Sequence, residues 1–353
     1  MRMTTRFSMA ALLAALAASV PASAQDNCTN RGQLDTIYCD ADNDLVADVP
    51  TDPAKQKDPS VLVFAYSPTE NPAVYKDIYD DIMAHLGTCT GKRMQFFNVQ
   101  SNSAQIEAMR AGRLHIGLYA TGAVGFAVNM AGAVPIVAIG SDKGLMGYRV
   151  YTIVKADSPY KTLADLKGKK VAHVAPSSNS GNLAPRVFFP EQGLKPDEDY
   201  KPLMSGGHDR SVIGVASGDY DAAAVASDIF ERMTGRGEVK ATDFRVIWQS
   251  EVFPTSSYSI SHDLKPELAA KLKGCLLSYK FSEAMKREYV GQDRLLPMTY
   301  KETWKPIRDV AERSGTPYNK VAYEAQVKRE AEAAAKKAAD AAAKAGQPAP
   351  TKP

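Results

Sequence analysis

The chain has 353 residues, of which 44% are apolar, so it is long and apolar enough for a globular protein with two or more domains and a sizeable core. The formal net charge is only +3, and no basic patch of the kind that binds nucleic acid is evident. Composition therefore excludes a disordered chain and argues against a nucleic-acid-binding protein.

Residues 1–24 have the three parts of a secretory signal peptide. Arg2 and Arg6 form a charged start, Met9–Val20 is an apolar run, and Ala22–Ala24 supplies the small residues of a cleavage site. The apolar run is too short for a stable membrane anchor, so we expect cleavage and no transmembrane segment in the mature chain. This pattern predicts export to an oxidising compartment, the periplasm of a bacterium.

The four cysteines agree with export, because an even set can pair in disulfides. We favour Cys28 with Cys39, which closes a short loop, and Cys89 with Cys275, which ties an early helix to a late one. Four cysteines allow three pairings. Free thiols at a metal or arsenic site are the other alternative, which an oxidising compartment disfavours.

Residues 25–60 form an N-terminal extension with an acidic turn. Its carboxylates belong to Asp40, Asp42, Asp44 and Asp48, and they can converge on one calcium ion when the chain curls around it. The turn lacks the glycine and the glutamate of an EF-hand loop and is more similar to a single calcium repeat of the thrombospondin type 3 kind. The alternatives are a structural calcium site and a solvated acidic linker.

A first α/β unit begins at Val61. The periodicities predict strand, helix, strand, helix and strand, in that order, over Val61–Tyr66, Ala73–Leu86, Met94–Val99, Ser103–Ala111 and Ile116–Tyr119. This order predicts a parallel sheet whose ligand loops follow the carboxyl ends of its strands. Those ends carry Tyr66, Asn102, Tyr119 and Thr121.

A second α/β unit begins near Tyr151, and its central feature is the loop after the strand Val171–Ala175. Small polar residues at positions 176–181 (PSSNSG) separate this strand from a segment that becomes helical at Asn182. Backbone N–H groups at a helix N-terminus, the helix dipole and the Ser and Asn side chains together suit a phosphate-like anion. The alternative is an ordinary cluster of N-cap residues.

Further polar residues lie at strand and helix ends of this unit. His208 opens a helix after two glycines, and Asp228 follows the strand Tyr220–Val225. The chain then returns toward the first unit and closes with helices within Pro266–Met285 and Lys301–Arg313.

Residues 321–353 form a tail that is rich in Ala, Lys and Glu and ends in a Pro-rich stretch. Its composition favours helix, but it has no apolar stripe to bury. We therefore expect a solvated, fraying helix followed by a disordered end.

Seven motifs occur in order along the chain and carry a family resemblance. They are Ser67–Glu70 (SPTE), Met109–Gly117 (MRAGRLHIG), Asp157–Pro159 (DSP), Leu163–Val171 (LADLKGKKV), Ser178–Pro185 (SNSGNLAP), Ser205–Asp209 (SGGHD) and Asp219–Val225 (DYDAAAV). Together they resemble the phosphonate-binding proteins of ABC importers. The resemblance covers about residues 61–314, and the combination is far more specific than any one motif.

The resemblance implies a two-lobed α/β periplasmic binding protein of the type II kind, in which each lobe is a mostly parallel sheet flanked by helices. It places lobe I at residues 61–150 and 252–320 and lobe II at residues 151–251. The implied function is to close the two lobes around a phosphonate, phosphite or phosphate, without catalysis or a required cofactor. The implied partners are an ABC permease and its ATPase, and we expect a monomer.

The resemblance also assigns site residues. Three loop residues would bind the anion's oxygens: Ser178, Asn179 and Ser180. Residues at neighbouring strand and helix ends would complete the cleft: Tyr119, His208 and Asp228. Three positions depart from the family pattern, because Asn179 replaces a usual Thr, Asn102 replaces a common Tyr, and Ser256 replaces a second carboxylate. Two carboxylates would surround the ammonium of an aminoalkyl phosphonate, so the last departure argues against that ligand.

Each of these residues has an alternative role. His208 and Asp228 can be helix caps, and Tyr119 can be packing at a strand end. Ser180, His208 and Asp228 also have the residue types of a hydrolase triad, but Ser180 is not in a Gly-x-Ser-x-Gly elbow. A periplasmic sensor subunit that partners a membrane histidine kinase would use the same cleft, so the sequence leaves that function open.

Overall fold

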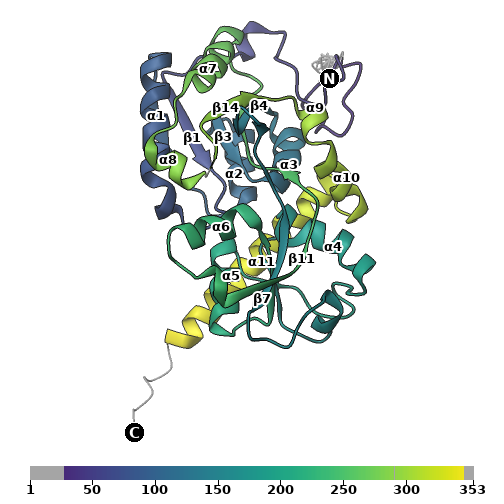
Figure 1. Cartoon of the computed structure of the whole chain (residues 1–353). Helices are drawn as coiled ribbons and strands as arrows, with labels where there is room; N and C mark the ends of the chain where they lie inside the picture. Colours follow the sequence, from purple (N-terminus) through teal and green to yellow (C-terminus); the bar gives the residue numbers. More distant parts are fainter. Residues whose placement is uncertain (1–27, 290, 346–353) are drawn as a thin grey trace, which may run out of the picture.

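The computed structural model describes residues 28–289 and 291–345 (Figure 1). The predicted signal peptide at residues 1–24 lies outside the described residues. None of the helices in the described ranges combines the length and the hydropathy that a membrane span requires.

The described chain folds into two α/β lobes, which lie one above the other in Figure 1 and are each built on a sheet of their own. We call the lobe with the seven-stranded sheet lobe I and the lobe with the five-stranded sheet lobe II. This arrangement confirms the two-lobed α/β class that the sequence predicts.

The sheet of lobe I is mixed, which corrects the expectation of a mostly parallel sheet in each lobe. Its strands, in spatial order, are β14 (Arg294–Pro297), β4 (Ala133–Ser141), β13 (Ser257–Ser261), β3 (Ile116–Tyr119), β1 (Val61–Tyr66) and β2 (Arg93–Phe96), with β5 (Gly144–Leu145) paired to β4. The predicted parallel pairing holds for β1 with β2 and β3, whereas the other pairs are antiparallel. The helices of this lobe are α1 (Lys76–Thr90), α2 (Asn102–Arg110), α3 (Thr121–Ala131), α7 (Pro266–Ser278), α8 (Glu283–Glu288), α9 (Tyr300–Thr303) and α10 (Lys305–Arg313).

Apolar cores cover both faces of this sheet. Successive side chains of a strand point to opposite faces. Phe64 and Leu118 therefore pack with the cluster of α1 and α7 on one face, and Ala65 and Tyr119 pack with the cluster of α2 and α3 on the other. This alternation decides which side chains of β1 and β3 can reach a ligand.

The sheet of lobe II is also mixed. Its strands, in spatial order, are β11 (Phe244–Gln249), β7 (Val150–Lys155), β10 (Ala222–Ala226), β8 (Val171–His173) and β9 (Leu203–Met204). Parallel pairing joins β10, β8 and β9, and β7 runs antiparallel to both of its neighbours. The helices are α4 (Ala184–Phe188), α5 (His208–Ser217) and α6 (Ser227–Gly235).

Two short extended segments connect the lobes. β6 (Gly147–Tyr148) leads into β7, β12 (Phe253–Pro254) follows β11, and the two pair as an antiparallel ribbon. Because the chain crosses between the lobes at these two adjacent places, a few backbone dihedrals there can change the angle between the lobes.

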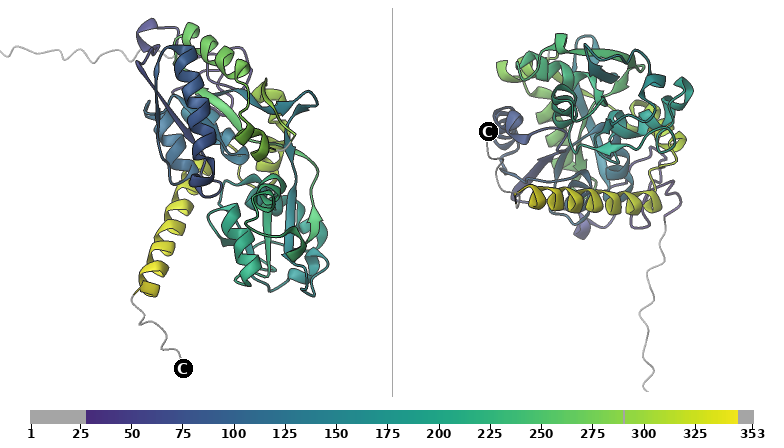
Figure 2. Two further views of the ribbon diagram at one scale, coloured as in Figure 1. Left: turned by 60° about the vertical axis from the view of Figure 1, so that its left-hand side comes forward. Right: turned by 90° about the horizontal axis from the view of Figure 1, so that it is seen from below.

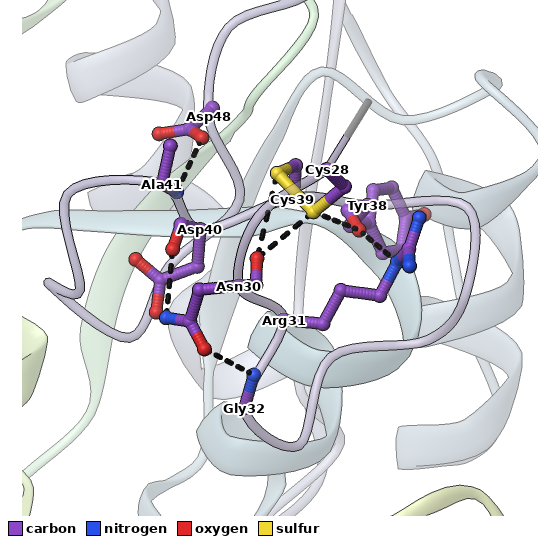
Figure 3. Close-up of a disulfide and its surroundings, with 9 residues drawn as sticks. All are labelled: Cys28, Asn30, Arg31, Gly32, Tyr38, Cys39, Asp40, Ala41 and Asp48. Atoms are coloured by element: carbon purple, nitrogen blue, oxygen red, sulfur yellow. Dashed lines mark hydrogen bonds between the residues drawn. A yellow bond between two sulfur atoms is a disulfide. The ribbon is translucent and has the colours of Figure 1, made fainter. Parts of the chain in front are cut away.

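Both predicted disulfides are present. Cys28–Cys39 closes a loop of the N-terminal extension (Figure 3), and Cys89–Cys275 joins α1 to α7 across 186 residues of sequence. A cross-link over so long a segment restricts the unfolded chain more than one over a short loop does. The second disulfide thus ties the C-terminal part of lobe I to its N-terminal part.

The C-terminal helix α11 (Lys320–Ala345) corrects the prediction of a solvated tail. Its first turns pack against α2 and α3, where Tyr323 and Gln326 are buried, and the helix then runs past the lobes (Figure 2). The hydroxyl of Tyr323 donates to Glu107 of α2. Ala322 and Val327 pack beside them partly buried, and so short an apolar stretch does not stand out as a stripe in the sequence.

This packing predicts how C-terminal truncation affects stability. A chain that ends at residue 319 should lose roughly 3 kcal/mol of unfolding free energy, because it loses the buried Tyr323. A chain that ends at residue 333 keeps both buried side chains and should match the full chain. Urea unfolding of the three proteins measures the difference, and equal stability of all three would contradict the packing role of α11.

Candidate functional site

A pocket of about 90 Å³ lies between the two lobes. Lobe I contributes the ends of β1 and β3 and the start of α3, lobe II contributes the polar loop and the starts of α5 and α6, and the crossover segments contribute Tyr148, Thr255 and Ser256. The pocket thus lies where the lobes meet and where the chain passes from one to the other. It is far smaller than the roughly 300–1,000 Å³ typical of sites for drug-sized ligands.

The helical segments around the pocket present their N-termini to it. A residue from the first turn of each lines the pocket: Asn102 of α2, Thr121 of α3, Asn179 of the π-helical turn Asn179–Leu183, His208 of α5 and Asp228 of α6. The first four N–H groups of a helix have no partner within the helix, and the dipole makes this end positive. Several such ends around one small volume favour an anion.

The loop at residues 176–181 is shaped by its own hydrogen bonds. Ser178 caps the π-helical turn by accepting from the N–H of Gly181 at 3.0 Å, so the predicted capping role is real, and its side chain also lines the pocket. The amide Nδ2 of Asn179 donates to the hydroxyl of Tyr148 at 2.8 Å. Tyr148 belongs to β6, so this bond joins the loop to a crossover segment.

His208 has a defined tautomer. Its Nδ1 accepts from the backbone N–H of Ala226 at 3.2 Å, so the proton of the neutral ring sits on Nε2, which lies 3.5 Å from the hydroxyl of Ser180. Burial lowers the pKa of His208 to about 4. The ring is therefore neutral at physiological pH and presents an N–H donor to the pocket.

The wall formed by α6 carries the charged groups. Among the described residues that line the pocket, only Asp228 and Arg232 bear a full charge. Nη1 of Arg232 donates to Oδ2 of Asp228 at 2.9 Å. Oδ1 of Asp228 is buried and has no hydrogen-bond partner in the described protein, so it can accept a hydrogen bond from a ligand.

The lobes touch directly beside the pocket. The N–H of His208 donates to the carbonyl of Thr69 at 2.9 Å, and the N–H of Asn71 donates to Asp209 at 3.2 Å. Gly122 at the start of α3 lies against the loop, because a Cβ at this position would be 2.0 Å from the carbonyl oxygen of Ser177. The structure thus has the lobes closed on each other.

The structure brings seven of the eight predicted ligand residues to this pocket, and it does not bring Tyr119. The seven are Tyr66, Thr121, Ser178, Asn179, Ser180, His208 and Asp228. Tyr119 is fully buried on the opposite face of β3, where its hydroxyl donates to the sulfur of Met109 at 3.3 Å. The prediction for Tyr119 is wrong because its neighbour Leu118 takes the face that is turned to the pocket.

Sequence reasoning missed part of the lining. The missed lining residues are Tyr75 just before α1, Tyr79 of α1, Tyr289 after α8, Tyr148 of β6 and Arg232 of α6. Two of these had a local signal, because Tyr79 stands four residues after Tyr75 and Arg232 stands four residues after Asp228, which puts each pair on one helix face. The others come from segments that only the tertiary fold brings together.

The acidic turn brings together three of the four carboxylates of the calcium prediction. Carboxylate oxygens of Asp40, Asp42 and Asp44 lie within 4.8 Å of one another, whereas Asp48 accepts from the N–H of Ala41 (Figure 3). Asp40 also accepts from the N–H groups of Asp44 and Leu45, so the turn is held by its own hydrogen bonds. Because those bonds explain the fold of the turn without an ion, calcium binding stays a prediction.

Comparison with known proteins identifies relatives of the chain. The family model described as the periplasmic substrate-binding protein of phosphonate ABC transporters matches residues 64–304. The phosphate-import protein PhnD of Mycolicibacterium smegmatis is 29% identical over 238 residues, which are 64% of this chain and 74% of that protein.

Solved structures show the same fold. PhnD1 of Prochlorococcus marinus, in complex with methylphosphonate, superposes with a TM-score of 0.66 at 18% identity over 73% of this chain and 99% of that one. A binding protein of a phosphonate ABC transporter from Pseudomonas aeruginosa also gives a TM-score of 0.66, at 21% identity over 80% of this chain and 99% of that one.

The close approach at Gly122 predicts a variant that hinders closure. In Gly122→Ala, the new methyl group meets backbone atoms of Ser177 and Asn179, which cannot rotate away, so the lobes must stay slightly apart. Overpacking of this kind costs about 1–3 kcal/mol, and we expect the affinity for inorganic phosphate or methylphosphonate to fall accordingly. Gly235→Ala is the control, because a Cβ there meets no atom within 4 Å. Calorimetric titration that finds equal affinity in both variants would contradict this reasoning.

Proposed function

Because the chain belongs to the family of periplasmic substrate-binding proteins of phosphonate ABC transporters, we propose that it binds a small phosphorus oxyanion for import without changing it chemically. Closure of lobe I (61–150 and 252–320) on lobe II (151–251) would enclose the ligand, with the crossover ribbon of β6 and β12 as the hinge. The closed complex would then dock on a permease and its ATPase. Binding proteins of this family need no cofactor.

The convergence of helix N-termini is the observation that carries the proposal. A tetrahedral oxyanion has acceptors that point in several directions, and the pocket is lined by first-turn residues of several helical segments, with the hydroxyl of Ser180 and Nε2–H of His208 as side-chain donors. The volume of about 90 Å³ restricts the ligand to few non-hydrogen atoms. A small phosphonate, phosphite or phosphate fits this chemistry.

The free acceptor of Asp228 favours phosphorus over sulfur. A carboxylate oxygen repels an oxyanion unless the anion presents a proton there. Phosphate and phosphonates keep a P–OH group near neutral pH, whereas sulfate and sulfonates do not. Oδ1 of Asp228 is buried and lacks a partner, so it supports a ligand that is bound in its protonated form.

The geometry of His208 argues against hydrolysis. A triad needs a histidine that accepts the serine proton at one nitrogen and donates to a carboxylate from the other. Here Nδ1 of His208 is taken by the N–H of Ala226, and no carboxylate among residues 28–289 and 291–345 hydrogen-bonds either ring nitrogen. With its proton on Nε2, the ring donates toward Ser180 and does not activate it.

Two relatives narrow the choice of ligand without deciding it. The relative from Mycolicibacterium smegmatis is named for phosphate import, and the neighbour from Prochlorococcus marinus was solved with methylphosphonate. Both ligands are small phosphorus oxyanions with no cationic group, which agrees with the small pocket of this chain.

A thermal-shift screen tests the function. Phosphate, phosphite, methylphosphonate, aminoethylphosphonate, sulfate and arsenite would be added separately to the protein. At least one phosphorus oxyanion should stabilise it, because a ligand present at 100 times its dissociation constant adds about 2.7 kcal/mol. Sulfate should raise the melting temperature less than the best phosphorus oxyanion does, because it carries no proton with which to donate a hydrogen bond to Asp228. Stabilisation by none of the anions, or turnover of a phosphoester, would overturn the proposal.

Substitution of Ser180 tests how much of the binding free energy comes from side chains. Much of the affinity should come from backbone N–H groups, which a side-chain substitution leaves in place, so Ser180→Ala should weaken binding by about 1.5–3 kcal/mol and not abolish it. Ser217→Ala, at the far end of α5, is the matched control and should bind as the wild type does. Calorimetry on the best anion of the screen measures both variants. An unchanged affinity in Ser180→Ala would remove Ser180 from the site.

A further inference from the structure

We propose that Arg232 determines specificity by filling the cation-binding wall of the pocket with a guanidinium group of the protein itself, so that ligands with a cationic substituent are excluded. The wall consists of Asp228, Arg232, Tyr75 and Tyr289. This inference rests on the proposed function, because it concerns which phosphorus oxyanions the pocket accepts.

Arg232 is buried and makes several ion pairs. Its side chain is 7% exposed, and it reaches carboxylates from both lobes: Asp228 at 2.9 Å, Glu288 at 3.2 Å and Glu70 at 3.5 Å. It also donates to the hydroxyl of Tyr75 at 3.1 Å. If this side chain swung away to make room for a ligand, its own buried charge would lose these partners and Asp228 would be left unpaired, which is costly.

The aromatic rings of the wall are already used by this guanidinium. Its carbon lies 5.2 Å from the ring centre of Tyr289 and 5.9 Å from that of Tyr75. Aromatic rings beside a carboxylate form the usual environment for an ammonium group. In this pocket the same rings face Arg232, so a ligand ammonium could meet Oδ1 of Asp228 only beside a fixed guanidinium group.

The charge of the wall also argues against a cationic substituent on the ligand. Of the three carboxylates that contact Arg232, only Asp228 lines the pocket, and one of its oxygens is bound to Arg232. Burial opposes the charge of Arg232, yet the surrounding tyrosines and carboxylates raise its pKa well above the ordinary value, so the group stays positive. A cationic substituent would therefore be placed beside a fixed positive charge in a desolvated pocket, where repulsion is strong.

Arg236 provides a matched control within the same cluster. It also pairs with Glu70 and Glu288, both across the lobes, but it does not line the pocket. A variant at this position weakens the contact between the lobes as one at Arg232 does, without opening the wall. The two substitutions thus separate the effect on closure from the effect on ligand choice.

The test compares two phosphonates of equal size. Ethylphosphonate and aminomethylphosphonate differ only in that an ammonium replaces a terminal methyl group, and methylphosphonate serves as the common reference. Calorimetry on the wild type should show that ethylphosphonate binds at least about tenfold more tightly than aminomethylphosphonate. In Arg232→Met that ratio should fall at least about tenfold, because the rings and Asp228 become available to the ammonium. In Arg236→Met the ratio should stay within about threefold of the wild-type value.

Each outcome decides the proposal. An unchanged ratio in Arg232→Met, or a wild type that binds aminomethylphosphonate as tightly as ethylphosphonate, would overturn it. Binding of methylphosphonate but of neither larger ligand by the wild type would also overturn it, since size and not charge would then exclude the cation. If Arg232→Met does not fold, the double variant Arg232→Gln with Glu288→Gln is used in its place, because it removes one buried charge of each sign. A wild type that binds no phosphorus oxyanion at all contradicts the proposed function, and this inference falls with it.

Discussion

An anion enclosed between two protein lobes must be balanced without water, and no cation among the described lining residues of this pocket is free to do so. Arg232, the cation of the lining, is committed to three carboxylates. The balance therefore falls to the first-turn N–H groups of helical segments from both lobes and to neutral donors such as His208. Donors of this kind are fixed by the fold, so their positions are complete only when the lobes are closed. Gly122 matters for that reason, since it lets the start of α3 approach the anion loop more closely than any side chain would allow.

The ion pairs between the lobes serve geometry more than stability. Glu70 and Glu288 of lobe I meet Arg232 and Arg236 of lobe II in the closed arrangement. When the lobes separate, these groups regain water, so the Coulomb attraction gained on closure is largely offset by desolvation. The ion pairs therefore mainly fix the relative orientation of the closed lobes, because a closure that leaves one of these buried charges unpaired is costly. The cluster thus selects one way of closing while it leaves the free energy of closure to be decided by the ligand.

Much of this site could be predicted from the sequence, because its signals are local. The β-α-β periodicity placed the strand ends, the loop at residues 176–181 had the composition of an anion cradle, and the cysteines paired as their spacing and order suggested. The prediction for Tyr119 was wrong because side chains at a strand end can point to either face of the sheet, and only the packing of α2 and α3 shows which face Tyr119 takes. Tyr289 could not be placed, because it reaches the pocket through contacts between segments that are far apart in the chain. The sequence did not predict the packing of α11 for a similar reason, since a few buried side chains around Tyr323 give no periodic signal.

Selectivity in such a pocket follows from its few acceptors more than from its many donors. Any small oxyanion can take hydrogen bonds from N–H and O–H groups, so the donors by themselves discriminate weakly. Oδ1 of Asp228 is different, since a ligand that brings no proton to it leaves a buried carboxylate oxygen facing negative charge. Arg232 makes that acceptor tolerable in the empty pocket by compensating the charge of Asp228 through Oδ2. It also keeps the carboxylate from becoming a cation site. The same ion pair therefore excludes ligands on both sides: those that lack a proton donor and those that carry a positive charge.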